Sequence, residues 1–75
     1  MQENANAINI EMDVIRNFGQ DNVQVLSDGI IKLKLKELGN GDILNISNLL
    51  LLADIHIKRS DKNILVLFTP ISSQR

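Results

Sequence analysis

A regular row of lysines is the feature of this sequence that most resembles a binding site. In the stretch VLSDGIIKLKLK, residues 25–36, lysines alternate with aliphatic residues, so one face of a predicted strand carries Lys32, Lys34 and Lys36. Alternate residues of a strand lie roughly 6.5–7 Å apart, a spacing that suits contacts with successive charges of an extended anionic polymer. The alternative is structural, since lysines also keep a strand face in water and prevent edge-to-edge pairing. Both interpretations stay open.

A second basic cluster lies in the segment KRSDKN. Lys58, Arg59 and Lys62 are predicted to gather near a hairpin tip, where Asp61 partly neutralises them. An arginine there is able to contact a phosphate with two hydrogen bonds. Phe18, in a predicted turn, is a candidate for stacking on a base, with a place in the core as the alternative.

Residues suited to catalysis or metal binding are sparse. Glu11 and Asp13 share one face of a predicted strand, but nothing supplies a third ligand or a nucleophile. His56 is the only histidine and the chain has no cysteine. The glycines of GNGD, residues 39–42, match no phosphate-binding motif. We therefore predict no enzyme activity, no cofactor and no metal site.

The composition fits one small domain, residues 1–75, with frayed tails at about 1–6 and 71–75. The net charge of −1 hides an asymmetry, because residues 1–28 hold one basic and five acidic residues and the remainder holds seven basic and four acidic ones. The absence of cysteine favours an intracellular location, nuclear in a eukaryote. No stretch resembles a signal peptide, and NLLLLA is too short to span a bilayer, so we expect no membrane insertion.

The hydrophobic pattern predicts mainly strands. Residues 8–14 alternate apolar and polar side chains, which indicates a strand, although a helix with Ile8, Met12 and Ile15 on one face is the alternative. Two hairpins follow, one turning at the SDG segment and one at RSDKN, and Pro70 is expected to end the sheet. Residues 42–54 fit either a helix or a strand. Five or six strands in so short a chain favour closure into a barrel, which removes exposed edges.

The order of these signals resembles an oligonucleotide-binding (OB) fold of the replication protein A and telomere-end-binding type. The motifs that carry the resemblance are LSDG at 26–29, GDIL at 41–44 and KNILVLF at 62–68, and it extends from Ile10 to Phe68. It implies a small five-stranded β-barrel that binds single-stranded nucleic acid without catalysis. Because such domains usually stack bases on aromatic rings and this chain has only two phenylalanines, an accessory or protein-binding role in such an assembly is expected.

The alternative fold is α+β, with one helix over residues 42–54 on a small antiparallel sheet. In that arrangement spare leucine surface is available for a protein partner or for self-association. The candidate interface residues are Leu49, Leu50, Leu51 and Leu52. This order of elements resembles the short N-terminal domains of secretins and TonB-dependent receptors, which implies an interaction or oligomerisation module that binds no nucleic acid.

Overall fold

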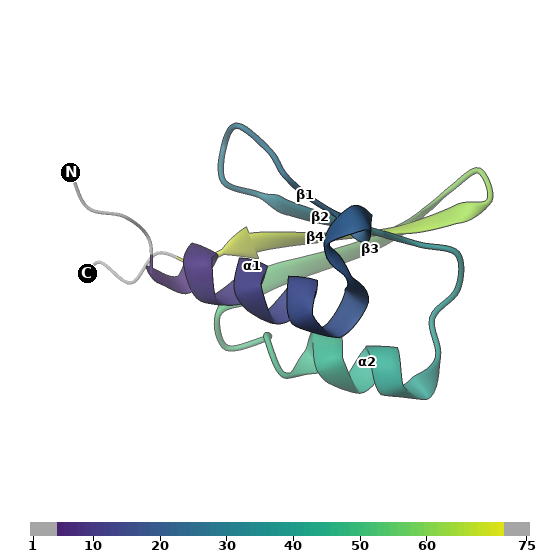
Figure 1. Ribbon diagram of the computed structural model, residues 1–75, viewed down its shortest axis with the longest axis horizontal. Coiled ribbons are helices and arrows are strands. Elements are labelled where there is room, and N and C mark those ends of the chain that lie inside the picture. Colours follow the sequence, from purple (N-terminus) through teal and green to yellow (C-terminus); the bar gives the residue numbers. More distant parts are fainter. Residues whose placement is uncertain (1–4, 72–75) are drawn as a thin grey trace.

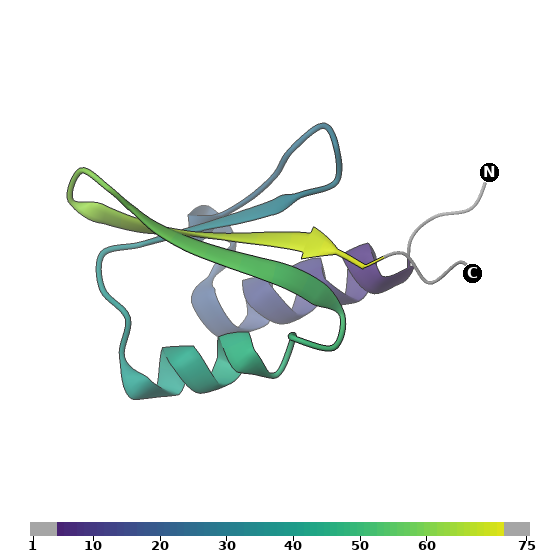
Figure 2. The same cartoon turned by 180° about the vertical axis from the view of Figure 1, so that it is seen from behind.

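The chain forms an open antiparallel sheet of four strands with two helices on one of its faces. A computed structural model describes residues 5–71 (Figure 1). In chain order the elements are α1 (Ala5–Phe18), a single 3₁₀ turn η1 (Gln20–Asn22), β1 (Val23–Val25), β2 (Ile31–Leu35), α2 (Asn40–Ser47), β3 (Ala53–Ser60) and β4 (Asn63–Pro70). The strands lie in the order β1-β2-β4-β3. Figures 1 and 2 show both helices on the same side of this sheet, so the domain has two layers.

The predicted mainly β, five-stranded OB-like barrel is therefore wrong, and the α+β alternative fits the structure. The largest error concerns residues 8–14, which belong to α1. Ile10 and Val14, one helical turn apart, are fully buried, whereas Ile8 and Met12 are exposed. A strand would have turned all four side chains to the same face. Apolar residues at every second position fit the two-residue period of a strand, and those four positions apart also fit one face of a helix. Packing against the sheet favours the helix.

The end of α1 and the first hairpin depend on two glycines. Gly19 follows the last residue of α1 with φ 93°, a backbone angle that glycine adopts without steric cost, and its N–H donates to the Ile15 carbonyl at 2.8 Å. Gly29 has φ 89° in the turn between β1 and β2. There the Asp28 carboxylate accepts a hydrogen bond from the Ile30 N–H at 3.2 Å. The predicted SDG hairpin is present.

The second helix is shorter than the alternative fold required. α2 begins at Asn40, and Asp42 in its first turn accepts a hydrogen bond from the Gly39 N–H at 2.9 Å. The helix ends at Ser47, and residues 48–52 form successive turns that lead into β3. Residues 42–54 are thus part helix, part turn and part strand.

The hairpin of β3 and β4 is also as the sequence predicted. Ser60 lies opposite Asn63, so Asp61 and Lys62 form the turn, with Asp61 in the left-handed region at φ 58°. β4 ends at Pro70, as expected of a residue without an N–H. Of the tails predicted to fray, residues 1–4 and 72–75 lie outside the described part of the chain.

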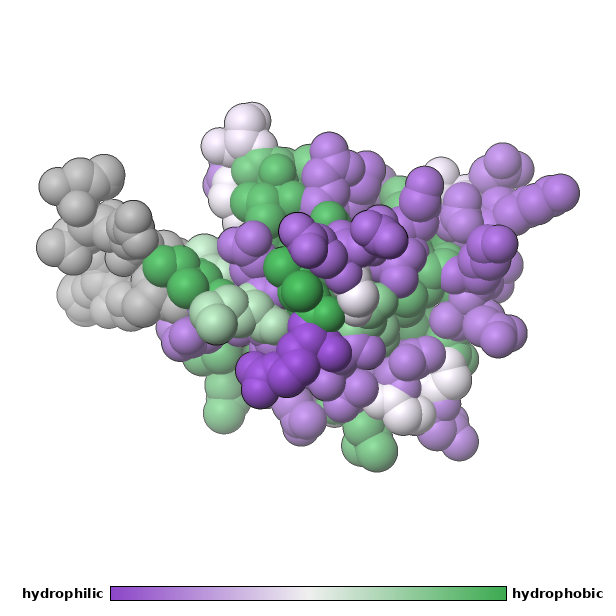
Figure 3. Space-filling view, viewed as in Figure 1, coloured by the Kyte–Doolittle hydropathy of each residue, from purple (hydrophilic) through white to green (hydrophobic). Residues whose placement is uncertain are grey.

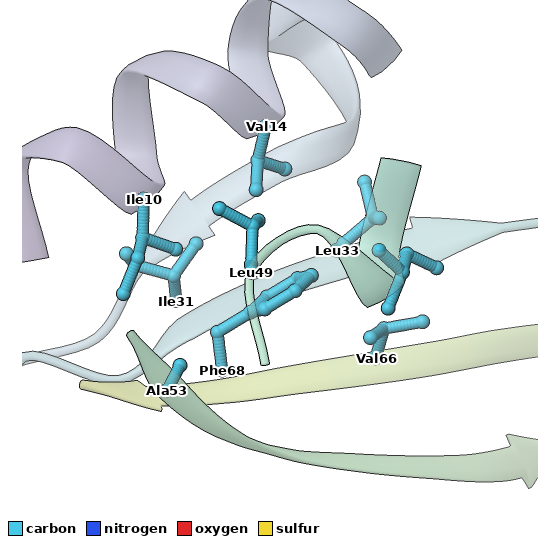
Figure 4. Packing of buried hydrophobic residues seen from close by; sticks show 9 residues of the cluster. Ile10, Val14, Ile31, Leu33, Leu49, Ala53, Val66 and Phe68 are labelled. Atoms are coloured by element: carbon cyan, nitrogen blue, oxygen red, sulfur yellow. The ribbon is translucent and has the colours of Figure 1, made fainter. Parts of the chain in front are cut away.

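The core fills the space between the sheet and the helical layer. It combines two residues of α1, two of β2, two of β4 and three from the segment 46–53 (Figure 4). The buried residues are Ile10, Val14, Ile31, Leu33, Ile46, Leu49, Ala53, Val66 and Phe68. All nine are apolar, and the two inner strands β2 and β4 each commit one face to this packing. The other face is free to carry function.

Candidate functional site: the open face of the sheet

The sheet has one face that no helix of the described chain covers. Along β2, Ile31 and Leu33 are buried under the helices, so the alternating residues Lys32 and Lys34 project from the opposite side. The same alternation along β4 buries Val66 and turns its neighbours outward. We call this side the open face.

Strand pairing places side chains of the open face in two rows across β2, β4 and β3. In one row Lys34 lies opposite Leu65, and Leu65 lies opposite Lys58. The adjacent row has the same form, since Leu67 lies between Lys32 of β2 and His56 of β3. Each row is therefore a leucine flanked by two nitrogen-bearing side chains, with neighbouring strands about 4.8 Å apart.

The charge of this face is mostly positive. The open face carries Lys32, Lys34 and Lys58, and the one carboxylate that the register places on it is Asp54, opposite Thr69. Within residues 5–71 the ion pair found is on α1, between Asp13 and Arg16, with 3.5 Å between Oδ1 and Nη2. None of the three lysines is thus neutralised by a carboxylate in the described structure. Because the chain has a net charge of −1, three positive charges on the open face mean that negative charge predominates on the rest of the protein.

The two leucines give the open face an apolar centre. Leu65 and Leu67 are half-buried on β4 and project from the face that no described helix covers. Lysine side chains commonly lay their aliphatic stems along apolar surface while the ammonium group stays in water. The arrangement offers apolar contact in the middle and positive charge at both margins, which suits an extended ligand with anionic and apolar parts.

The predicted binding residues outside the open face are dispersed. Lys36 follows the end of β2 and Lys62 lies in the hairpin turn, both exposed. Arg59 lies opposite Ile64, on the side of the sheet that carries the helices. Phe18 ends α1 and packs half-buried against the core, on the opposite side of the sheet from the open face. Sequence reasoning missed Leu65 and Leu67, because ILVLF is apolar throughout and does not reveal which residues face outward.

The two acidic residues expected to share a strand face, Glu11 and Asp13, do not lie side by side. Glu11 and Asp13 are two positions apart on a helix, where side chains at that spacing do not face each other. Residues 5–71 contain no group of three or more histidine, aspartate or glutamate side chains positioned to hold a metal ion. The surface of the same residues shows no pocket.

The predicted leucine interface is divided by the structure. Leu49 is buried in the core and Leu52 is half-buried, whereas Leu50 and Leu51 are exposed. Ile43 and Leu44 of α2 are exposed as well. Figure 3 shows apolar side chains protruding along the lower edge of the molecule, where α2 and the turns after it lie. This apolar surface is separate from the open face.

Comparison of the chain with protein-family models, with characterised proteins and with solved structures finds no match. No helix within residues 5–71 is long and apolar enough to cross a membrane. The functional argument therefore depends on the geometry of the open face itself.

Proposed function

We propose that this protein is a non-enzymatic binding module that holds an extended single-stranded nucleic acid against the open face of its sheet. The observation that carries the proposal is the register that aligns Lys34, Leu65 and Lys58 across three adjacent strands, with a matching row alongside. Positive side chains at both margins neutralise phosphates, and the binding of nucleic acids through phosphate contacts depends strongly on salt.

The apolar centre accounts for a single strand better than for a duplex. Bases in a duplex are stacked and paired inside, so the duplex presents phosphates and groove edges to a flat surface. An unpaired strand is able to place bases on Leu65 and Leu67 while its phosphates contact the lysines. Because the described residues of the open face include no phenylalanine, tyrosine or tryptophan, each base contributes less than the 1–3 kcal/mol typical of stacking on such rings. We expect modest affinity and little sequence preference.

Fluorescence anisotropy tests the proposal directly. Labelled 15-nucleotide single strands of DNA and RNA are titrated with the protein at 20 mM and 150 mM salt, with a duplex of equal length for comparison. Saturable binding that is stronger for single strands and weaker at higher salt is expected. Absence of binding to both single strands at 20 mM salt and several hundred micromolar protein would refute the proposal.

A matched pair of variants locates the site. Replacing Lys32, Lys34 and Lys58 with glutamine removes the charge from the open face, and binding at 20 mM salt is expected to fall at least tenfold. Replacing Lys36, Arg59 and Lys62 with glutamine removes the same total charge from elsewhere and is expected to weaken binding far less. Equal losses in the two variants would show that overall charge, and not the open face, governs binding.

A further inference from the structure

The outer edge of β3 is the most exposed stretch of backbone hydrogen-bonding groups in the sheet. β3 is eight residues long and pairs with β4 on one side only, whereas the other edge strand, β1, has three residues (Figure 2). A long edge strand presents unpaired N–H and C=O groups that readily accept another strand. No described segment pairs with this edge of β3.

The register shows which residues direct their backbone groups outward. Ala53 lies opposite Pro70, which has no N–H, and the next pair along the ladder is joined by a hydrogen bond from the Ile71 N–H to the Leu52 carbonyl at 2.8 Å. Hydrogen-bonded and non-hydrogen-bonded pairs alternate in an antiparallel ladder. The odd-numbered residues of β3 therefore point their N–H and C=O groups away from β4. Consistent with this, the Ala53 N–H bonds to the Leu49 carbonyl instead.

We propose that a second copy of this chain pairs antiparallel with β3, about a two-fold axis at His56, to form a continuous sheet of eight strands. In this register Ile55 lies opposite Ile57 of the second copy, and each of these pairs exchanges two backbone hydrogen bonds. Asp54 lies opposite Lys58 of the second copy, and the two His56 side chains face each other at the axis. The pairing does not depend on the proposed binding of nucleic acid.

Charge complementarity selects this register. A two-fold axis perpendicular to the sheet brings together residues of the same face, so Asp54, His56, Lys58 and Ser60 face one another in the registers centred on His56 or Ile57. An axis at His56 forms two pairs between Asp54 and Lys58. Moving the axis to Ile57 would set His56 opposite Lys58 and leave Asp54 opposite Ser60. Opposite charges in directly facing positions stabilise a strand pair, and like charges destabilise it.

Apolar burial favours the same arrangement. Ile57 is 53% exposed although it lies on the side of the sheet that carries the helices, next to half-buried Ile55. Because of the two-fold symmetry, the dimer contains two pairs of Ile55 with Ile57 of the other copy. Each pair covers part of the exposed surface of both side chains. The contact area of one strand pair is small, so we expect a dimer that dissociates in the micromolar range.

Such a dimer would also extend the proposed binding surface. Because the axis is perpendicular to the sheet, the open faces of both copies lie on the same side. The row of Lys32, Leu67 and His56 would then continue through the axis into the same row of the second copy, whereas the row that ends at Lys58 would meet Asp54 of the second copy. A strand of nucleic acid longer than one domain would be able to contact both copies.

Analytical ultracentrifugation of the full chain from 1 to 500 μM tests the dimer, and charge exchange tests its register. Asp54→Lys and Lys58→Asp are each expected to weaken dimerisation at least tenfold, because each sets like charges opposite each other. An equimolar mixture of the two variants is expected to restore it as a heterodimer. A wild-type chain that stays monomeric at 500 μM, or a mixture that shows no recovery, overturns the proposal.

A cysteine cross-link provides an independent test that leaves all lysines in place. The chain has no cysteine, and facing residues of a non-hydrogen-bonded pair have Cα atoms about 4.5 Å apart, within the range of a disulfide. His56→Cys is expected to form a covalent dimer on mild oxidation, whereas Ser60→Cys is expected to remain largely monomeric. Equal cross-linking of both variants would refute the register. Anisotropy measured on the unsubstituted chain reports on nucleic-acid binding separately, so the two proposals fail or succeed independently.

Discussion

Lys34 and Lys58 both lie opposite Leu65, one on each side of the central strand β4. Two positive side chains are thereby held on either side of an apolar one by backbone pairing alone. Because they come from β2 and β3, segments separated by α2 in the chain, no local sequence pattern predicts their proximity. The following expectations depend on this arrangement and on the way the helices face the sheet.

The apolar centre of the open face is expected to contribute to binding without affecting its salt dependence. Replacing Leu65 and Leu67 with threonine keeps strand-forming residues but removes apolar contact area. We expect affinity for single-stranded DNA to fall about three- to tenfold, with an unchanged slope of log affinity against log salt. Anisotropy titrations at four salt concentrations measure both quantities. A change in slope would mean that the leucines act by positioning the lysines.

The lysines are expected to determine the salt dependence itself. For single strands the slope is about −0.7 for each phosphate neutralised, so three lysine contacts account for a slope of about −2. Changing Lys32, Lys34 and Lys58 to glutamine is expected to reduce the magnitude of the slope by about that amount. The same titration series measures it, and a slope identical to that of the wild type would place the phosphate contacts elsewhere.

The orientation of α1 predicts opposite outcomes for two neighbouring substitutions. Val14 is fully buried and Met12 is 61% exposed. Val14→Asp buries a charge in the core and is expected to cost about 3 kcal/mol or more, which is a large part of the stability of a domain this small. Met12→Asp is expected to change the free energy of unfolding by about 0.5 kcal/mol or less. Urea unfolding followed by circular dichroism measures the free energy of unfolding of both variants. Equal losses of stability would contradict the orientation in which α1 packs on the sheet.

The parts of the fold that the sequence predicted are those with local causes. Gly29 and Asp61 mark the two hairpin turns, and the flanking alternation or apolar runs indicate the strands. Over residues 8–14 a helix was only the alternative to a strand, because apolar residues alternate there, and that alternative placed Ile8 and Met12, which are exposed, on its apolar face. The helix is stabilised by packing against the sheet, most of whose strands are distant from α1 in the sequence.

The open face was only half predictable for a related reason. Alternation in β2 correctly placed Lys32 and Lys34 on one side. Lys58 was assigned to a hairpin tip, because nothing in the sequence states that it lies two strands away from Lys34. The assignment of Phe18 as a stacking residue assumed a turn, whereas the residue ends a helix and packs against the core. Register and helix facing are set by tertiary packing, and both were needed to define the site.

Replacing His56 with lysine is expected to weaken the proposed dimer. The two side chains at position 56 would face each other at the axis, so the substitution sets two positive charges opposite each other. On its own strand His56 is flanked by Asp54 and Lys58, and the second copy presents the same two groups in reverse order. On β4 the facing residues Leu65, Leu67 and Thr69 are uncharged, with Lys32 beyond Leu67.

Since the aspartates and lysines at the interface largely cancel, the main effect of His56→Lys is repulsion between the two introduced lysines. Like charges directly opposite each other cost about 0.2–1 kcal/mol, so the dissociation constant is expected to rise up to about fivefold. Analytical ultracentrifugation measures the change, with His56→Gln as the control that removes the ring without adding charge. A dimer of the control variant that weakens equally would show that loss of the histidine, and not repulsion at the axis, causes the effect.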